Sequence, residues 1–339
     1  MTGFLTNILN GINGFVNNYG WAIVLFTIFI RLLLLPLDIK NRQGMRKMQK
    51  IQPELNKLQK KYANDKVKLQ QKQSELMRRE KYNPMAGCLP LLIQMPILFA
   101  MFGAMRQIAN EQTVQQVFTF LQGNEPLYEG WLWVKNLWMA DSPFVSVAPN
   151  MQTIQMIPLN VWTDIFQKLT PETQEAIRAT VTSLGGVLDF TTADGLKNSL
   201  PFIEQALLQV PAYQTALATM PGWTNLNFIL FNVSVFVQYN GLLILPILAG
   251  ASQMLMTKMT PGMSQPAGQD GQQQPGMNNF MKYFFPIFSV YICLTSNAGF
   301  ALYWVVSNLI ATASNFGVNA YFDHADKAAA LLEGENTVR

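Results

Sequence analysis

Long runs without charged residues alternate with charged segments along this chain of 339 residues. A helix needs about 20 apolar residues to cross the hydrocarbon of a membrane, so each such run predicts a span. The uncharged stretch between Lys282 and Asp323 is long enough for two spans, and Ser296-Asn297-Ala298-Gly299 inside it is typical of a tight turn. The pattern therefore predicts five spans, at residues 19–38, 84–106, 239–258, 282–297 and 299–319.

The composition agrees with a membrane protein and argues against an enzyme. Half of the residues are apolar and 13% are charged, about half the charged fraction of a typical soluble domain. Two cysteines, Cys88 and Cys293, and one histidine, His324, leave no set for a disulfide framework or an ordinary His/Cys metal site. We predict no catalytic residues, no metal, no cofactor and no small-molecule substrate.

The basic residues predict the orientation of the spans. Residues 40–81 contain fourteen Lys and Arg against four acids, whereas residues 107–238 contain four against ten. Basic loops stay on the cytoplasmic side of a membrane. We therefore expect a multi-pass protein of the plasma membrane with its N-terminus outside and its C-terminus in the cytoplasm.

The basic segment 39–83 carries apolar residues three or four positions apart, which predicts a helical hairpin turning near residue 64. Pro53 is expected to kink or restart its first helix. The net charge of +10 over residues 40–81 suits anionic lipid, ribosomal RNA or a ribosome-bound chain, and charge alone does not choose among them. The alternative is a solvated polar connector.

The remaining segments lie outside the predicted spans. Residues 1–18 have apolar positions at helical spacing, which predicts an amphipathic helix on the outer interface. The aromatic run 131–138 is typical of a membrane–water interface. Residues 146–238 predict a mostly helical outer insert, in which Thr170-Pro171-Glu172 begins one helix and Pro201 begins another. Residues 259–281 are interpreted as a flexible cytoplasmic loop and residues 320–339 as a cytoplasmic tail.

Arg31 is the most informative residue, because it lies deep in the first predicted span. A central arginine costs about 2.5–3.5 kcal/mol on insertion scales, so we expect it to face a protein interior or a watery cavity. The alternative is that its side chain reaches the cytoplasmic headgroups, since Asp38 is near. The apolar runs contain no acid, so no counter-ion is expected within the membrane. Polar residues that would line a cavity with Arg31 are Thr27, Gln94, Ser252, Gln253, Thr295, Ser307, Asn308 and Thr312.

Three motifs carry a resemblance to a known family. They are Gly20-Trp21-Ala22-Ile23 with Arg31-Leu32-Leu33-Leu34-Leu35-Pro36-Leu37, Asn83-Pro84-Met85-Ala86-Gly87-Cys88-Leu89-Pro90-Leu91-Leu92-Ile93-Gln94-Met95-Pro96-Ile97, and Gly299-Phe300-Ala301-Leu302-Tyr303-Trp304-Val305-Val306-Ser307-Asn308. Together they resemble the YidC/Oxa/Alb family of membrane-protein insertases, in a Gram-positive-like form. Leu245-Pro246-Ile247-Leu248-Ala249-Gly250 also resembles the third span of the family, and the matches cover about residues 20–110, 239–260 and 280–320, in the order of the family.

The resemblance implies an all-α polytopic membrane protein whose five transmembrane helices surround a hydrophilic groove, closed outside and open to the cytoplasm and lipid. Its clients would be nascent membrane proteins, and its partners the lipid bilayer and, as candidates, a Sec translocon and the ribosome. Arg31 matches the arginine of the groove, and the tail lacks the basic character of some relatives, so ribosome contact would fall to the hairpin at 40–81. The implied groove residues are Arg31, Thr27, Gln94, Gln253, Trp304, Ser307 and Asn308.

A second class of function uses the same arginine. A small-anion transporter or channel would attract its substrate with Arg31, but five spans do not divide into two equivalent halves. An intramembrane protease would need paired acids, a Ser-His pair or a metal, and the apolar runs lack acids and histidine. Insertion of client proteins is therefore the favoured function.

Overall fold

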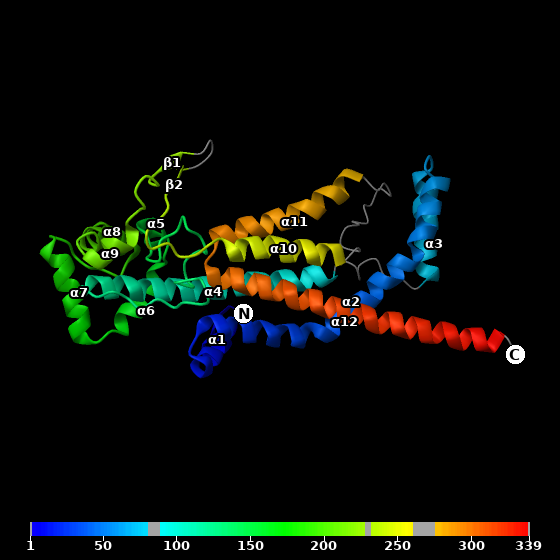
Figure 1. Cartoon of the computed structure of the whole chain (residues 1–339), viewed down its shortest axis with the longest axis horizontal. Helices are drawn as coiled ribbons and strands as arrows, with labels where there is room; N and C mark the ends of the chain where they lie inside the picture. The colour runs from blue at the N-terminus through cyan, green and yellow to red at the C-terminus, as the bar shows by residue number, and fades with distance from the viewer. Residues whose placement is uncertain (1, 81–88, 228–231, 260–274, 338–339) are drawn as a thin grey trace. The chain divides into compact units, whose positions relative to one another are not determined.

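The computed structural model describes residues 2–80, 89–227, 232–259 and 275–337, most of which are helical. Figure 1 shows the helices in chain order, from α1 (Thr2–Val16) to α12 (Ala298–Thr337). The chain forms two compact units, and several helices contribute residues to both. The first unit comprises Met1–Val24, Ala100–Ile247 and Tyr291–Leu302, and the second comprises Leu25–Phe99, Leu248–Val290 and Tyr303–Arg339.

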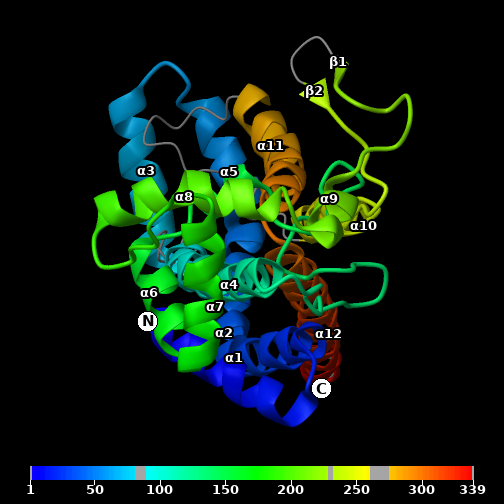
Figure 2. The same ribbon diagram turned by 90° about the vertical axis from the view of Figure 1, so that its left-hand side faces the viewer.

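The first unit is built around the C-terminal half of α4 (Leu89–Leu121), which continues beyond residue 106, the predicted end of its span. Figures 1 and 2 show short helices gathered around this end of α4. A short antiparallel hairpin, not predicted from the sequence, follows them. These elements are α5 (Met151–Gln155), α6 (Leu159–Gln167), α7 (Pro171–Ser183), α8 (Ala193–Leu207), α9 (Pro211–Leu217), β1 (Leu226–Asn227) and β2 (Asn232–Val233).

Aromatic side chains form the core of this unit. The ring of Phe118 on α4 lies edge-on to that of Trp162 at 5.7 Å, and Phe190 stacks on Trp162 at 5.4 Å. Trp162 is fully buried and belongs to the apolar stripe that predicted α6. The core therefore holds the insert on a helix that continues from a predicted span.

Capping residues decide where the insert helices begin. The hydroxyl of Thr170 accepts a hydrogen bond from the Thr173 amide, so the predicted start of α7 is confirmed. The predicted start at Pro201 is wrong: α8 begins at Ala193, where Thr192 caps it, and Pro201 lies within the helix. A cap with an acid in the first turn determines this start, and the helix tolerates the proline.

The second unit contains most of α2 (Tyr19–Lys61). This helix continues through Pro53, so a restart of the helix at Pro53, one of the two predicted possibilities, is wrong. Asp65 caps α3 (Lys66–Arg79) by accepting from the Lys68 amide, so the predicted turn near residue 64 is confirmed.

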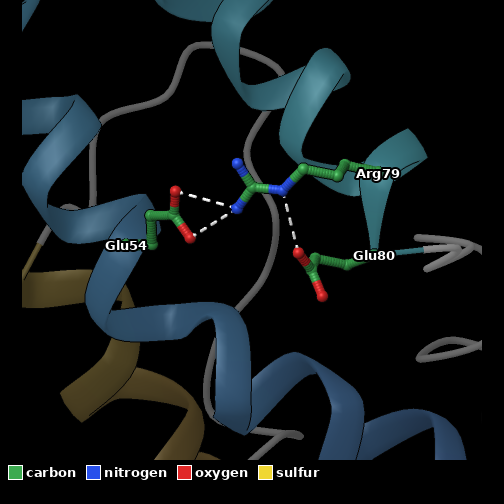
Figure 3. Close-up of polar contacts among 3 residues, drawn as sticks. All are labelled: Glu54, Arg79 and Glu80. Atoms are coloured by element: carbon green, nitrogen blue, oxygen red, sulfur yellow. Dashed lines mark hydrogen bonds and ion pairs between the residues drawn. The ribbon is translucent and has the colours of Figure 1, made fainter.

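The seam of this helical hairpin is narrow. Ile51 and Leu55 of α2 are buried against Leu76 of α3. Arg79 spans the open end, donating to Glu54 at 2.8 and 3.0 Å and to Glu80 at 3.0 Å (Figure 3). Exposed ion pairs contribute little to stability. The hairpin is therefore held together weakly, by a few buried apolar side chains and the hydrogen bonds of Arg79.

The other helices of the second unit are α10 (Ile244–Met259), α11 (Pro275–Thr295) and α12. A Cβ added at Gly250 would lie 2.5 Å from the Val290 side chain, so glycine allows α10 to approach α11 closely. The helix α12 continues to Thr337, so the described part of the predicted tail is helical.

By length and composition, α2 is the one helix among the described residues that could cross a membrane. Its best window of 18 residues has a mean hydropathy of 2.3. Lys282–Thr295 of α11 is apolar but shorter. The first residues of the predicted span 84–106 and most of the predicted loop 259–281 lie outside the described residues.

Candidate functional site

Arg31 lies in the second unit, and its half-buried side chain points from α2 to α12. Its Nε and Nη2 atoms both donate to the Ser307 hydroxyl, at 3.0 and 2.6 Å. A hydroxyl is a neutral acceptor, so this contact orients the guanidinium without balancing its charge. The arrangement leaves a positive potential within an otherwise apolar stretch of helix.

Asp38, named from the sequence as a near neighbour of Arg31, interacts electrostatically with Arg31 and with Arg42. The absence of a counter-ion within the membrane stays a prediction. Seven residues make about two helical turns, which places Asp38 on the same face of α2 as Arg31. The hydrogen bonds of Arg31 still go to a hydroxyl rather than to this carboxylate.

A second polar group joins α12 to α10. The side-chain amide of Asn308 donates to Gln253 Oε1 at 3.1 Å and to Ser252 Oγ at 3.3 Å. All three side chains are buried, and Thr312 Oγ1, one turn further along α12, is buried without a hydrogen-bond partner among the described residues. Buried polar atoms without protein partners are places where water is held.

The second unit thus contains most of the predicted groove residues. Ser307 and Asn308 are adjacent on α12 and bond to different helices, while Thr27 is buried one turn before Arg31 on α2. Trp304 is half-buried on α12. The side chain of Gln94 lies outside the described residues. Thr295 lies in the first unit and is exposed, so it is not brought together with the others.

Two further arginines, which sequence reasoning missed, continue the polar contacts along α2 and α12. Arg42 donates to Asn319 at 3.3 Å, and Arg46 pairs with Asp323. Burial lowers the pKa of Arg42 from its ordinary value, and the nearby Asp38 partly offsets this, but an arginine stays charged.

The partners of the three arginines, at positions 31, 42 and 46, are offset along the chain by 276 or 277 residues. A constant offset means that α2 and α12 run parallel. From position 31 to 46 the contacts extend over about 22 Å at the rise of an α-helix. The three arginines are eleven and four residues apart in the sequence, spacings that place them on one face of α2. This spacing is the sequence signal that could have predicted them as a group.

A different polar cluster in the first unit holds the beginnings of three helices. Its centre is the hub segment, residues 129–147. Asp141 is fully buried and accepts from the amides of Leu242 and Leu245 at 2.7 Å and from Trp133 Nε1 at 3.1 Å. The carboxylate therefore caps the start of α10.

The hub segment also reaches α2 and α12. Glu129 accepts from the Tyr19 amide at 2.9 Å, and the carbonyls of Leu137 and Met139 accept from the first residues of α12 at 2.9 and 2.8 Å. Trp138, interpreted from the sequence as interfacial, is buried against the ring of Tyr19. The hub segment therefore ties together the N-terminal ends of α2, α10 and α12.

We expect Asp141→Ala to lower the free energy of unfolding by about 2–4 kcal/mol, because it leaves buried donors without an acceptor. Asp141→Asn should lose less, since an amide oxygen still accepts. The measurement is thermal or denaturant unfolding of the full chain in detergent. The control is Asp194→Ala, an exposed acid in the first turn of α8, and equal losses in the two alanine variants would contradict this role of Asp141.

An apolar helix with an embedded arginine, which hydrogen-bonds to a neutral hydroxyl of another helix, is typical of an α-helical membrane protein. Among the described residues, no group of three His, Cys, Asp or Glu is placed to hold a metal ion. The family model of the 60Kd inner membrane protein matches residues 11–197 and 196–325. The chain therefore belongs to this family, and the predicted YidC/Oxa/Alb membership is confirmed.

Relatives from three organisms carry the name membrane protein insertase YidC. That of Fusobacterium nucleatum is 50% identical over 103 residues, covering 30% of this chain and 50% of the relative. That of Clostridium perfringens is 40% identical over 154 residues, covering 43% and 58%. That of Xanthomonas oryzae is 37% identical over 165 residues, covering 48% and 25%. The chain thus aligns with a quarter to somewhat over half of these relatives, and its family is one of the inner or plasma membrane.

Proposed function

We propose that this protein is a membrane-protein insertase. The observation that supports this function most directly is the position of Arg31. The arginine lies in the apolar stretch of α2, is half-buried and is held by a neutral hydroxyl, so its charge remains available to an incoming polar or acidic segment. The names of the relatives point to the same activity.

The proposed membrane arrangement has five crossings, at residues 19–38, 84–106, 239–258, 282–297 and 299–319. The N-terminus is outside and the C-terminus is in the cytoplasm. The parallel course of α2 and α12 supports this path, because three crossings between them return the chain to the side from which α2 starts. The basic hairpin then lies in the cytoplasm and the acidic insert outside.

The proposed groove is lined by polar side chains from several of these helices. Its buried amides and hydroxyls supply hydrogen bonds, and the unpartnered Thr312 hydroxyl supports the presence of water. The proposed groove is closed outside and open to the cytoplasm and to lipid. The groove set is Arg31, Thr27, Gln94, Gln253, Trp304, Ser307 and Asn308.

The proposed mechanism lowers a solvation barrier. A client with a short polar outer segment must move it through hydrocarbon, where each unsatisfied backbone group costs several kcal/mol. In a wet groove the segment stays hydrogen-bonded for part of the path, and Arg31 attracts its acids. The apolar part of the client leaves sideways into lipid near Trp304. Apolar transfer and, for acidic segments, the membrane potential drive the process without covalent chemistry.

The proposed partners follow from the surfaces of the chain. Nascent membrane proteins and lipid are required by the mechanism. The charge of +10 on the 40–81 hairpin makes the ribosome a candidate, and the outer insert makes a Sec translocon a candidate.

The function is tested with proteoliposomes that contain only this protein. A client with one span and a short acidic outer segment is synthesised in their presence, and protection of that segment from added protease measures insertion. We expect protection with the protein and little in empty liposomes. Flux of small anions through the same liposomes is measured in parallel. Anion flux without client protection would favour the transporter and contradict the insertase.

A further inference from the structure

A cavity of about 430 Å³ lies between α2 and α12 in the second unit and contains none of the groove residues. Its size is within the roughly 300–1,000 Å³ typical of ligand sites. A Cβ added at Gly317 would meet no atom within 4 Å, so the α12 side of the cavity is open. The lining residues are Ile39, Gln43, Gly317, Val318, Tyr321 and Phe322, most of them apolar.

The cavity lies where both helices change from apolar to charged sequence. On α2 the first charges after the apolar stretch are Asp38 and Lys40, and on α12 the uncharged run ends at Asp323. Such a boundary corresponds to the headgroup level of a membrane. Tyr321, which is 70% exposed beside the cavity, is a residue typical of that level. The cavity therefore opens at the cytoplasmic surface of the bilayer in the proposed arrangement.

Cationic groups border the cavity on its cytoplasmic side. The guanidinium of Arg46 lies 5.2 Å from the centre of the Phe322 ring, and it pairs with the exposed Asp323. Lys47 and Lys50 are exposed four and seven residues after Gln43, spacings that keep them on the same side of α2. An apolar cavity with a rim of three cations and one acid has the charge distribution that suits an anionic amphiphile.

We infer that this cavity holds an acyl chain of an anionic phospholipid, whose phosphate lies against Arg46, Lys47 and Lys50. The apolar walls take the chain, and the basic rim takes the negative headgroup. The headgroup competes with Asp323 for Arg46, which is accessible because its side chain is 22% exposed. A zwitterionic lipid would fit the walls equally well, but its ammonium group would oppose the lysines.

The test uses the full chain in detergent and no client, so its result does not depend on insertase activity. The probe is phosphatidylglycerol with a photoactivatable group on one acyl chain, and phosphatidylcholine with the same chains is the comparison. Mass spectrometry locates the labelled peptides. We expect labelling within 39–43 and 317–322 to be at least about fivefold stronger with phosphatidylglycerol, since each basic residue near a membrane favours anionic lipid by about 1 kcal/mol.

Two substitutions on α12 separate the cavity from its surroundings. Gly317→Leu fills the open space with a residue that favours helix, and should reduce labelling about tenfold by excluding the methylene groups. Ala320→Leu introduces the same side chain at an exposed position outside the cavity and should leave labelling unchanged. Lys47→Gln with Lys50→Gln should lower phosphatidylglycerol labelling to the level of phosphatidylcholine.

Two results would overturn the inference. They are equal labelling by the two lipids in the wild type and labelling that Gly317→Leu does not reduce.

Discussion

Arg31→Ala is expected to slow the insertion of a client with an acidic outer segment by about ten- to hundredfold. Two opposite charges 4 Å apart interact with about 4 kcal/mol at an effective dielectric constant of 20, and hydration of the groove leaves only part of this. Because each 1.4 kcal/mol changes a rate about tenfold, a loss of 1.4–2.8 kcal/mol gives the expected range. The measurement is the rate of client protection in proteoliposomes.

The controls distinguish charge from shape. Arg31→Lys should retain most of the activity, because a positive charge remains even though the fork on Ser307 is lost. A client whose acids are replaced by amides should lose little with Arg31→Ala. Ser307→Ala, which keeps the charge and removes its acceptor, should have a small effect. Equal loss with Lys and Ala would point to bidentate recognition, and equal loss for both clients would refute the electrostatic role.

The sequence predicted helices where the pattern is local. The stop at residues 62–65 and the cap at Thr170 depend on neighbouring residues, and both are found. The extents of α2, α4 and α12 were not predicted, because a helix continues past the apolar boundary when polar residues with good helix propensity follow. The expected start at Pro201 failed because a cap nine residues earlier, Thr192, determines where α8 begins.

The candidate site was predicted by residue type and not by geometry. An arginine deep in the first predicted span and the scarcity of polar residues in the apolar runs were enough to select Ser307 and Asn308. Their actual partners, on different helices, depend on register between segments far apart in the chain, for which the sequence has no local signal. Asp141 was missed for the same reason, since the amides that it caps are about a hundred residues away.

Replacing residues 48–80, most of the helical hairpin, with a Gly/Ser linker is expected to reduce client insertion at least about tenfold and leave the rest of the chain folded. The hairpin has its own small apolar seam, and the contacts of Arg42 and Arg46 with α12 remain in this deletion. Backbone hydrogen bonds of membrane helices are satisfied within each helix, so the spans do not depend on the arm. Thermal unfolding of the deletion in detergent and client protection in proteoliposomes are measured side by side.

Point variants test whether the two helices of the hairpin must be held together or whether the presence of the hairpin is enough. Arg79→Ala removes the fork between the hairpin helices, whereas Lys72→Ala removes an exposed pair within α3 alone. If the function needs the arm closed, Arg79→Ala lowers insertion more than Lys72→Ala, although both remove one cation. Equal small effects would mean that basic charge alone matters, as for binding to ribosomal RNA or anionic lipid. Wild-type insertion by the deletion itself would exclude the arm from the mechanism, because a segment that captures clients or controls access to the groove cannot be dispensable.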